Sequence, residues 1–237
     1  VHSATYRQSS DHRAEFTELD PNNELLHRQN RFRVEAEIIR DLNLAVAGLL
    51  SDKVGGPSVF PPMPAGIANL SYANSFKWNV SKGTDRYRRG LYTFFKRTSP
   101  HPNLLTFDCP DSNVACVKRN RSNTPLAALV TLNNVTYVEA ARCFAEQLLR
   151  QPGSDGDRLR QALAIATGRP ARRAEIDLLA RRLTKLQTHY AGNPESVKEL
   201  LSIGEAKPDQ ALDGAQVAAL TGITSLILNL DEVITKE

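Results

Sequence analysis

The stretch 124-TPLAALVTLNNVTYVEAARCFAEQLLR-150 decides the fold class of this chain. Thr124 is a good N-cap and Pro125 suits the first helical position, so a helix is expected over PLAALVTL. Two asparagines then interrupt that helix. Thr136 and Glu139 have the spacing of a capping box, which predicts a second helix through AARCFAEQLLR. Two helices in succession indicate a mainly α chain.

Helical signals continue downstream of this stretch. The segment DRLRQALAIAT ends at Gly168, as a helix C-terminus should. Two further helices are expected, one that begins at Pro194 and one capped by Asp213. Between Gly168 and these two helices, the segment 174–190 carries one apolar stripe at helical spacing. Its members are Ile176, Leu179, Leu183, Leu186 and Tyr190.

Upstream, the segment 32–50 (FRVEAEIIRDLNLAVAGLL) also has helical periodicity. Its apolar positions are Val34, Ile38, Leu42, Ala45 and Leu49. Arg40 and Asn43 fall outside this stripe, so they are expected away from the core. The breakers in GGPSVFPPMPAG (55–66) end the helix, and a long ordered loop is expected from there to about Asp85.

The segment 87–110, YRRGLYTFFKRTSPHPNLLTFDCP, favours strands. Residues 91–95 are rich in β-formers, and LLTF (104–107) follows the turn-like SPHPN as a second short strand. The predicted fold class is therefore a mainly α, helical bundle-like domain with a small two-stranded β element and a long ordered loop. One domain over 1–237 is expected, with a possible division into a loop-rich half, 1–121, and a helical half, 122–237.

Composition narrows the class of protein further. The chain is 41% hydrophobic and 24% charged, which is ordinary for a folded domain and too apolar for wholesale disorder. No run of about 18 apolar residues exists, so no membrane span is expected. The net charge of +4 permits an acidic partner without requiring one.

One window concentrates basic residues. Between Arg86 and Arg121 there are eight Lys or Arg residues and only two acids, Asp108 and Asp111. Such a window would attract phosphate, sulfate, carboxylate or a polyanion. The candidate ligand-binding residues are Arg88, Arg89, Lys96, Arg97, Arg119 and Arg121. The alternative is structural: the cations face water or pair internally, with Asp108 bound by Arg97 or Arg88.

Other kinds of site find little support. The five histidines are scattered without metal-binding spacing, so no metal site is expected. The GGPS stretch is not a nucleotide-binding loop. The chain contains no C-x-x-C-H motif, so it carries no covalently attached c-type haem. Cys109 and Cys116 flank a turn-like stretch and would close a small loop in an oxidising compartment.

A series of motifs resembles one family. SATYRQSS, DPNNELLHRQ, RVEAEIIRD, GGPSVFPP, YRRGLYTFFKRT, LLTFDCP, RNRSNTPLAALVTLN, YVEAAR and LNLDEVITKE occur in this order. Together they look like the uncharacterised C-terminal domain of planctomycete-type cytochrome c proteins. The resemblance covers essentially the whole chain, and the family's domain normally begins upstream of SATYRQSS, so a fragment of a longer polypeptide is expected.

The resemblance implies an exported protein, periplasmic or extracellular, with upstream domains that include a cytochrome c module carrying the haem. Export would make a bond between Cys109 and Cys116 possible. The leading hypothesis is a non-catalytic module that docks the redox module or binds a polyanionic glycan through the basic window. The alternative is part of a haem-linked oxidoreductase acting on carbohydrate, with Asp108 as a base. Nucleic-acid binding through the same window is a third reading, and export argues against it.

Overall fold

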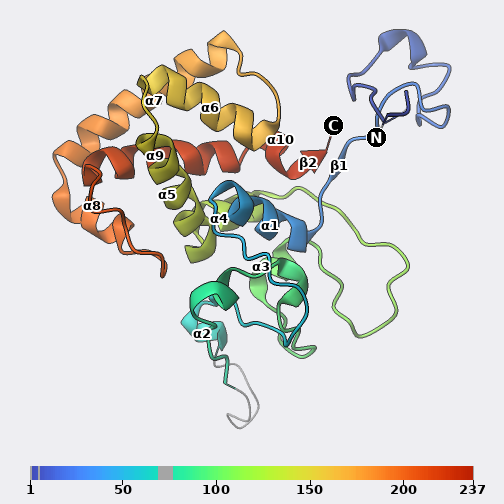
Figure 1. The fold of residues 1–237 in the computed structure, drawn as a ribbon. Helices are drawn as coiled ribbons and strands as arrows, with labels where there is room; N and C mark the ends of the chain where they lie inside the picture. Colours follow the sequence, from blue (N-terminus) through green and yellow to red (C-terminus); the bar gives the residue numbers. More distant parts are fainter. Residues whose placement is uncertain (1, 5, 69–76, 237) are drawn as a thin grey trace.

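The computed structural model describes residues 2–4, 6–68 and 77–236, and it shows a mainly helical chain with one two-stranded antiparallel sheet (Figure 1). This confirms the predicted fold class. In the described part of the chain, no helix combines the length and apolar character needed to cross a membrane. The helices are α1 (Ala36–Val46), α2 (Ala65–Ala68), α3 (Pro102–Thr106), α4 (Pro125–Asn133), α5 (Val135–Arg150), α6 (Asp155–Thr167), α7 (Arg173–Ala191), α8 (Pro194–Leu201), α9 (Gly214–Leu228) and α10 (Asp231–Ile234).

A helical bundle forms the larger part of the molecule. Helix α9 contacts α5, α6, α7 and α8, and it lies among them in Figure 1. Its sequence is apolar on nearly all sides, as expected for a helix surrounded by others. The first core cluster lies here, and Ile176 and Leu183 of the predicted stripe are buried in it, with Leu179, Leu186 and Tyr190 packed against it.

A second core cluster joins α1, α3, α4 and α5. Ile39, Phe107 and Tyr137 lie at its centre, and Ile234 near the C-terminus completes it. Because Ile39 precedes residue 121 and Tyr137 follows it, this cluster crosses the boundary expected between the two halves of the chain.

The face that α1 buries differs from the prediction. Ile39 and Leu44 are buried, whereas Ala45 of the expected stripe is exposed. Arg40 and Asn43, expected away from the core, are buried. The prediction was wrong because these two polar side chains reach backbone carbonyls: Asn43 Nδ2 donates to Ile39 O at 2.9 Å, and Arg40 Nη2 to Arg86 O at 2.7 Å.

Local capping signals fixed most helix ends. Thr124 caps α4, Asp213 caps α9, and Gly168 ends α6 in the left-handed conformation, all as predicted. The capping box at Thr136 and Glu139 was wrong. Helix α5 begins two residues earlier than this box predicts, with Asn134 as the cap, so Thr136 and Glu139 both lie inside it and are buried.

The sheet lies elsewhere than predicted. It pairs β1 (Phe32–Arg33) with β2 (Thr235–Lys236). The expected strand at 91–95 is replaced by a 3₁₀ helix, η4 (Gly90–Tyr92), and an isolated bridge between Thr93 and Val59. The expected strand at 104–107 lies largely in α3, because His101 caps a helix whose first residue is a proline.

Three irregular segments complete the chain. The segment 2–31 stands apart from the helical body in Figure 1, near the C-terminus. It is held by its own hydrogen bonds, such as those from Glu24 N and Leu25 N to Asp20. The predicted long loop contains α2 and the 3₁₀ helix η3 (Gly83–Tyr87), while its residues 69–76 lie outside the described residues. The segment 111–123 forms a further loop without helix or strand.

Candidate functional site

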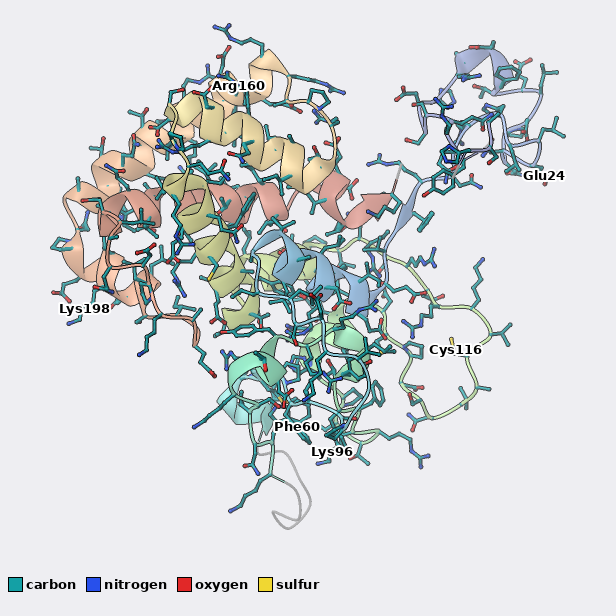
Figure 2. The ribbon with its side chains drawn as sticks, viewed as in Figure 1. Glu24, Phe60, Lys96, Cys116, Arg160 and Lys198 are labelled. Carbon is teal, nitrogen blue, oxygen red and sulfur yellow. The ribbon has the colours of Figure 1, made fainter. Side chains whose placement is uncertain are left out.

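The predicted basic site is not one surface. Its residues are held at separate places by separate partners, and Figure 2 shows Lys96 low in the molecule and Cys116 on a loop to the right of the helices. Two cations of the same window, Arg86 and Arg88, are buried. Each predicted residue therefore has its own set of contacts.

Arg88 is enclosed by the glycine-containing loop that follows α1. Arg88 is only 1% exposed. The guanidinium donates to Pro57 O at 2.9 Å and to Gly55 O, and it lies 3.8 Å from the centre of the Tyr92 ring. Gly55 adopts a positive φ of 75°, which glycine tolerates without strain. The carbonyls of this loop thus bind an arginine of the chain itself.

Arg89 pairs with Asp41 of α1. Arg89 Nε lies 3.1 Å from Asp41 Oδ2, and Gly90 N donates to Asp41 Oδ1 at 2.6 Å. The backbones approach so closely here that a Cβ on Gly90 would lie 2.7 Å from the Cα of Glu37. These contacts hold residues 88–90 against α1, and the charge of Arg89 is paired with an acid of the same chain.

Arg119 and Arg121 bring the loop 111–123 back to the start of α1. Arg119 Nη1 lies 2.8 Å from Glu37 Oε2 and 3.2 Å from Glu35 Oε2. Its hydrogen bond to Glu37 raises the pKa of Arg119, so the guanidinium stays charged. Arg121 Nη2 lies 3.6 Å from Glu35 Oε1, and its guanidinium lies 5.0 Å from the Phe32 ring centre. Both cations are therefore paired with acids outside the window.

Asp108 pairs with Arg33 rather than with Arg88 or Arg97. Its Oδ2 accepts from Arg33 and from Ser122 N at 2.7 Å, and its Oδ1 accepts from the Ser122 hydroxyl at 3.0 Å. Burial acts to raise the pKa of Asp108, but the hydrogen bonds from Ser122 and Arg33 outweigh it and lower the pKa below its ordinary value. Both carboxylate oxygens are occupied, an arrangement that stabilises an anion and does not favour proton abstraction.

The remaining predicted residues do not converge. Lys96 is half-buried and Arg97 is exposed. Cys109 is half-buried and Cys116 exposed; both are free thiols in the structure and are not bonded to each other. Burial, with a smaller effect of Glu37, raises the pKa of Cys109 to about 11, so this thiol is a poor nucleophile at neutral pH.

The most elaborate arrangement of charges centres on a residue that was predicted only as a cap. Glu139 of α5 is 1% exposed. Its Oε1 accepts from the Tyr87 hydroxyl at 2.7 Å, Glu205 N at 2.6 Å and Ala206 N at 2.8 Å. Its Oε2 lies 3.7 Å from Arg86 Nε. Burial and the bond to Glu139 raise the pKa of Tyr87, so its hydroxyl remains a donor.

A second buried pair on α5 continues this cluster. Arg142 donates to Glu146 one turn later and to Ala206 O. At the end of the helix, Arg150 Nε lies 2.8 Å from Asp209 Oδ2. One face of α5 therefore binds the loop between α8 and α9 through charged side chains. The spacing of Glu139, Arg142 and Glu146 along one helical face was the signal available in the sequence.

Metal ligation is not supported by the placement of the usual ligands. Within residues 2–4, 6–68 and 77–236, no group of three or more His, Cys, Asp or Glu side chains is arranged to hold a metal ion.

The fold and these contacts define a mainly helical domain that uses its buried charges to bind its own segments. Residues 1–183 match the family described as PSD1, protein of unknown function (DUF1553). The chain belongs to this family, which is the domain associated with planctomycete cytochrome c proteins, and the resemblance seen in the sequence is confirmed. Domains of this family typically sit in multidomain proteins. No curated protein and no solved structure matches the chain.

Proposed function

We propose that this chain is a non-catalytic docking module of an exported, cytochrome-linked polypeptide, and that α4 contacts a neighbouring domain of that polypeptide. The observation that carries the proposal is the outward face of α4. The helix contains no charged residue, yet Leu126 is 60% and Leu129 56% exposed. A helix that is apolar on all sides is ordinarily buried.

The surroundings of α4 extend this face. The inward side of the helix packs on α5 and α9 through Ala127 and Thr131. Leu226 of α9 is 39% exposed, and Leu230, which caps α10, is 40% exposed. Because α4 and α9 are in contact, these leucines and those of α4 supply the apolar centre that a domain interface needs. Membership of a family found in multidomain proteins supports a neighbouring domain as the occupant.

A more specific proposal is that the chain binds a polyanionic glycan. The geometry supports glycan binding less well than it supports docking of a domain. Arg88, Arg89, Arg119 and Arg121 already have internal partners. Exposed Arg97 remains the best placed of the predicted residues. The oxidoreductase alternative, with haem supplied by a cytochrome c module, gains no support from Asp108, whose oxygens are occupied. Periplasmic or extracellular location rests on the family resemblance.

Titration of this chain with the separately produced upstream domains of the same polypeptide tests docking. The double variant Leu126→Glu/Leu129→Glu should weaken binding by about tenfold or more, because two charges would enter an apolar interface. Isothermal titration calorimetry gives the dissociation constants. Both leucines are exposed, so the variant should fold normally, which circular dichroism can verify.

Leu178→Glu is the matched control, since Leu178 lies on α7 and is also 60% exposed. It should bind as tightly as the unmodified chain. Equal affinity for all three proteins would rule out α4 as the docking face. Chromatography on heparin tests the glycan form separately: retention that is insensitive to Arg97→Glu would exclude Arg97 as the contact.

A further inference from the structure

A small internal cavity lies where four segments of the chain meet. Its volume is about 10 Å³. It is lined by Ala36 and Arg40 of α1, Pro61 and Thr93 of the bridged loops, His101, Asn103 and Leu104 of α3 and its cap, and Tyr137 of α5. It lies in the second core cluster, close to the buried aromatic ring of Trp78, whose centroid is 5.7 Å from that of His101.

Two residues that line this cavity carry buried polar atoms without partners. Arg40 Nε and Thr93 Oγ1 are buried, and neither has a hydrogen bond within the described part of the chain. Arg40 is 6% exposed and Thr93 9%. A buried polar atom left unpaired costs roughly 1–3 kcal/mol, so a partner that satisfied both atoms would stabilise the fold.

The other polar groups of the lining residues already form hydrogen bonds, and one of them can accept a second bond. His101 Nδ1 accepts from Asn103 N at 3.3 Å, which leaves Nε2 as the donor to Pro62 O at 3.0 Å. The Pro61 carbonyl accepts from Trp78 Nε1 at 2.8 Å and retains a second lone pair. The residues that line the cavity thus carry a donor on Arg40, a hydroxyl on Thr93 that donates or accepts, and a carbonyl acceptor on Pro61.

We infer that this cavity is a binding site for a single ordered water molecule that joins α1 to the bridged loop. The water accepts from Arg40 Nε and exchanges a hydrogen bond with the Thr93 hydroxyl. Such a site needs two to four polar partners and a volume of at least about 10–15 Å³. The lining residues carry the polar groups, and the volume reaches the lower limit. The inference is independent of the docking proposal.

Size separates water from the other candidate occupant, a small anion. Among the described residues Arg40 forms no ion pair with a carboxylate, since Asp41 is bound by Arg89 and Gly90, so an anion would be attracted to Arg40. The volume, however, is at the lower limit for one water molecule, and chloride is larger. The site therefore selects the smallest polar ligand.

Oxygen-17 magnetic relaxation dispersion counts long-lived internal waters and tests the inference on the whole chain. Thr93→Val should lose one such water relative to the unmodified protein, while Thr93→Ser, which keeps the hydroxyl, should retain it. Thr93→Val should also lower the folding equilibrium constant about 5- to 30-fold, since Arg40 Nε loses its bridging partner.

Thr136→Val is the matched control. The Thr136 hydroxyl is also buried and unpartnered, but Thr136 does not line the cavity. Its replacement should leave the water count unchanged and the folding constant unchanged or higher. An unchanged water count in Thr93→Val overturns the inference. So does an anomalous diffraction peak in the cavity of crystals grown with bromide, which would identify an anion site.

Discussion

At the scale of the residue, Glu139 is a buried charge with four partners. Three donors converge on one of its oxygens, and Arg86 lies near the other. A carboxylate is stable at such depth only when its hydrogen bonds are satisfied. Glu139 therefore holds together three segments that are distant in the sequence: η3, α5 and the loop after α8.

Glu139→Ala should destabilise the protein strongly. The change leaves Arg86 and the Tyr87 hydroxyl without their carboxylate, and breaking a buried pair in this way costs roughly 3–5 kcal/mol. Urea unfolding monitored by circular dichroism measures the loss. Glu199→Ala, at an exposed position on α8, is the control and should change stability by no more than about 0.5 kcal/mol. Equal losses in the two variants would contradict the role given to Glu139.

At the scale of the element, the loop between α8 and α9 is held against α5 by polar contacts, and its Ala206 packs on the core cluster of Ala47, Ala140 and Cys143. Its residues 205 and 206 bond to Glu139 and Arg142, and Asp209 bonds to Arg150. Gly204 permits this approach. It has a φ of +97°, and a Cβ there would lie 2.2 Å from the Glu139 carboxyl carbon.

Gly204→Ala should therefore displace the loop from α5. Gly168→Ala is the matched control, because Gly168 also has a positive φ, +76°, but open space around its Cβ position. The control should cost only the left-handed backbone penalty of about 1–2 kcal/mol. Gly204→Ala should cost more, and hydrogen exchange should show faster exchange at residues 203–212. Unchanged exchange in that segment would show that the loop tolerates the side chain.

At the scale of the whole molecule, stability should depend on pH through His101. Burial, opposed by the bond to Pro62 and reinforced by Arg40, lowers the pKa of His101 to about 4 from 6.5. The folded protein therefore binds fewer protons at this site than the unfolded chain between these values. The stabilisation is complete above pH 6.5 and is lost as the pH falls to 4.

Urea unfolding at pH 7.0 and 4.5 measures this loss, which is about 3 kcal/mol over the full interval at 1.36 kcal/mol per pKa unit. His101→Asn keeps a side-chain acceptor for Asn103 N but does not titrate, so its stability should vary less over the same interval. The bonds from Arg169 lower the pKa of Glu175 to about 2, so that group contributes mainly below pH 4.5. Parallel pH profiles for the two proteins would exclude His101 as the cause.

Sequence alone predicted the features that depend on near neighbours. The caps at Thr124 and Asp213 and the end of α6 at Gly168 follow from residues within one turn. The charge pairs could not be predicted in this way, because Tyr87 and Glu139 are 52 positions apart and Arg33 and Asp108 are 75 apart. The basic window does contain an excess of cations, but the acids that pair with Arg89, Arg119 and Arg121 lie outside the window.

The β1–β2 sheet bears on the order in which the molecule assembles. Arg31 and Asp231, which pair beside it, are 200 positions apart, whereas the main contacts of the bundle, α5 with α9 and α7 with α9, join helices that are closer in the sequence. Contacts between distant positions form slowly, since a long loop must close first. During synthesis, β1 must wait unpaired until β2 has left the ribosome. Pairing of these two short strands would thus be a late event, and it reports that the rest of the chain has already folded.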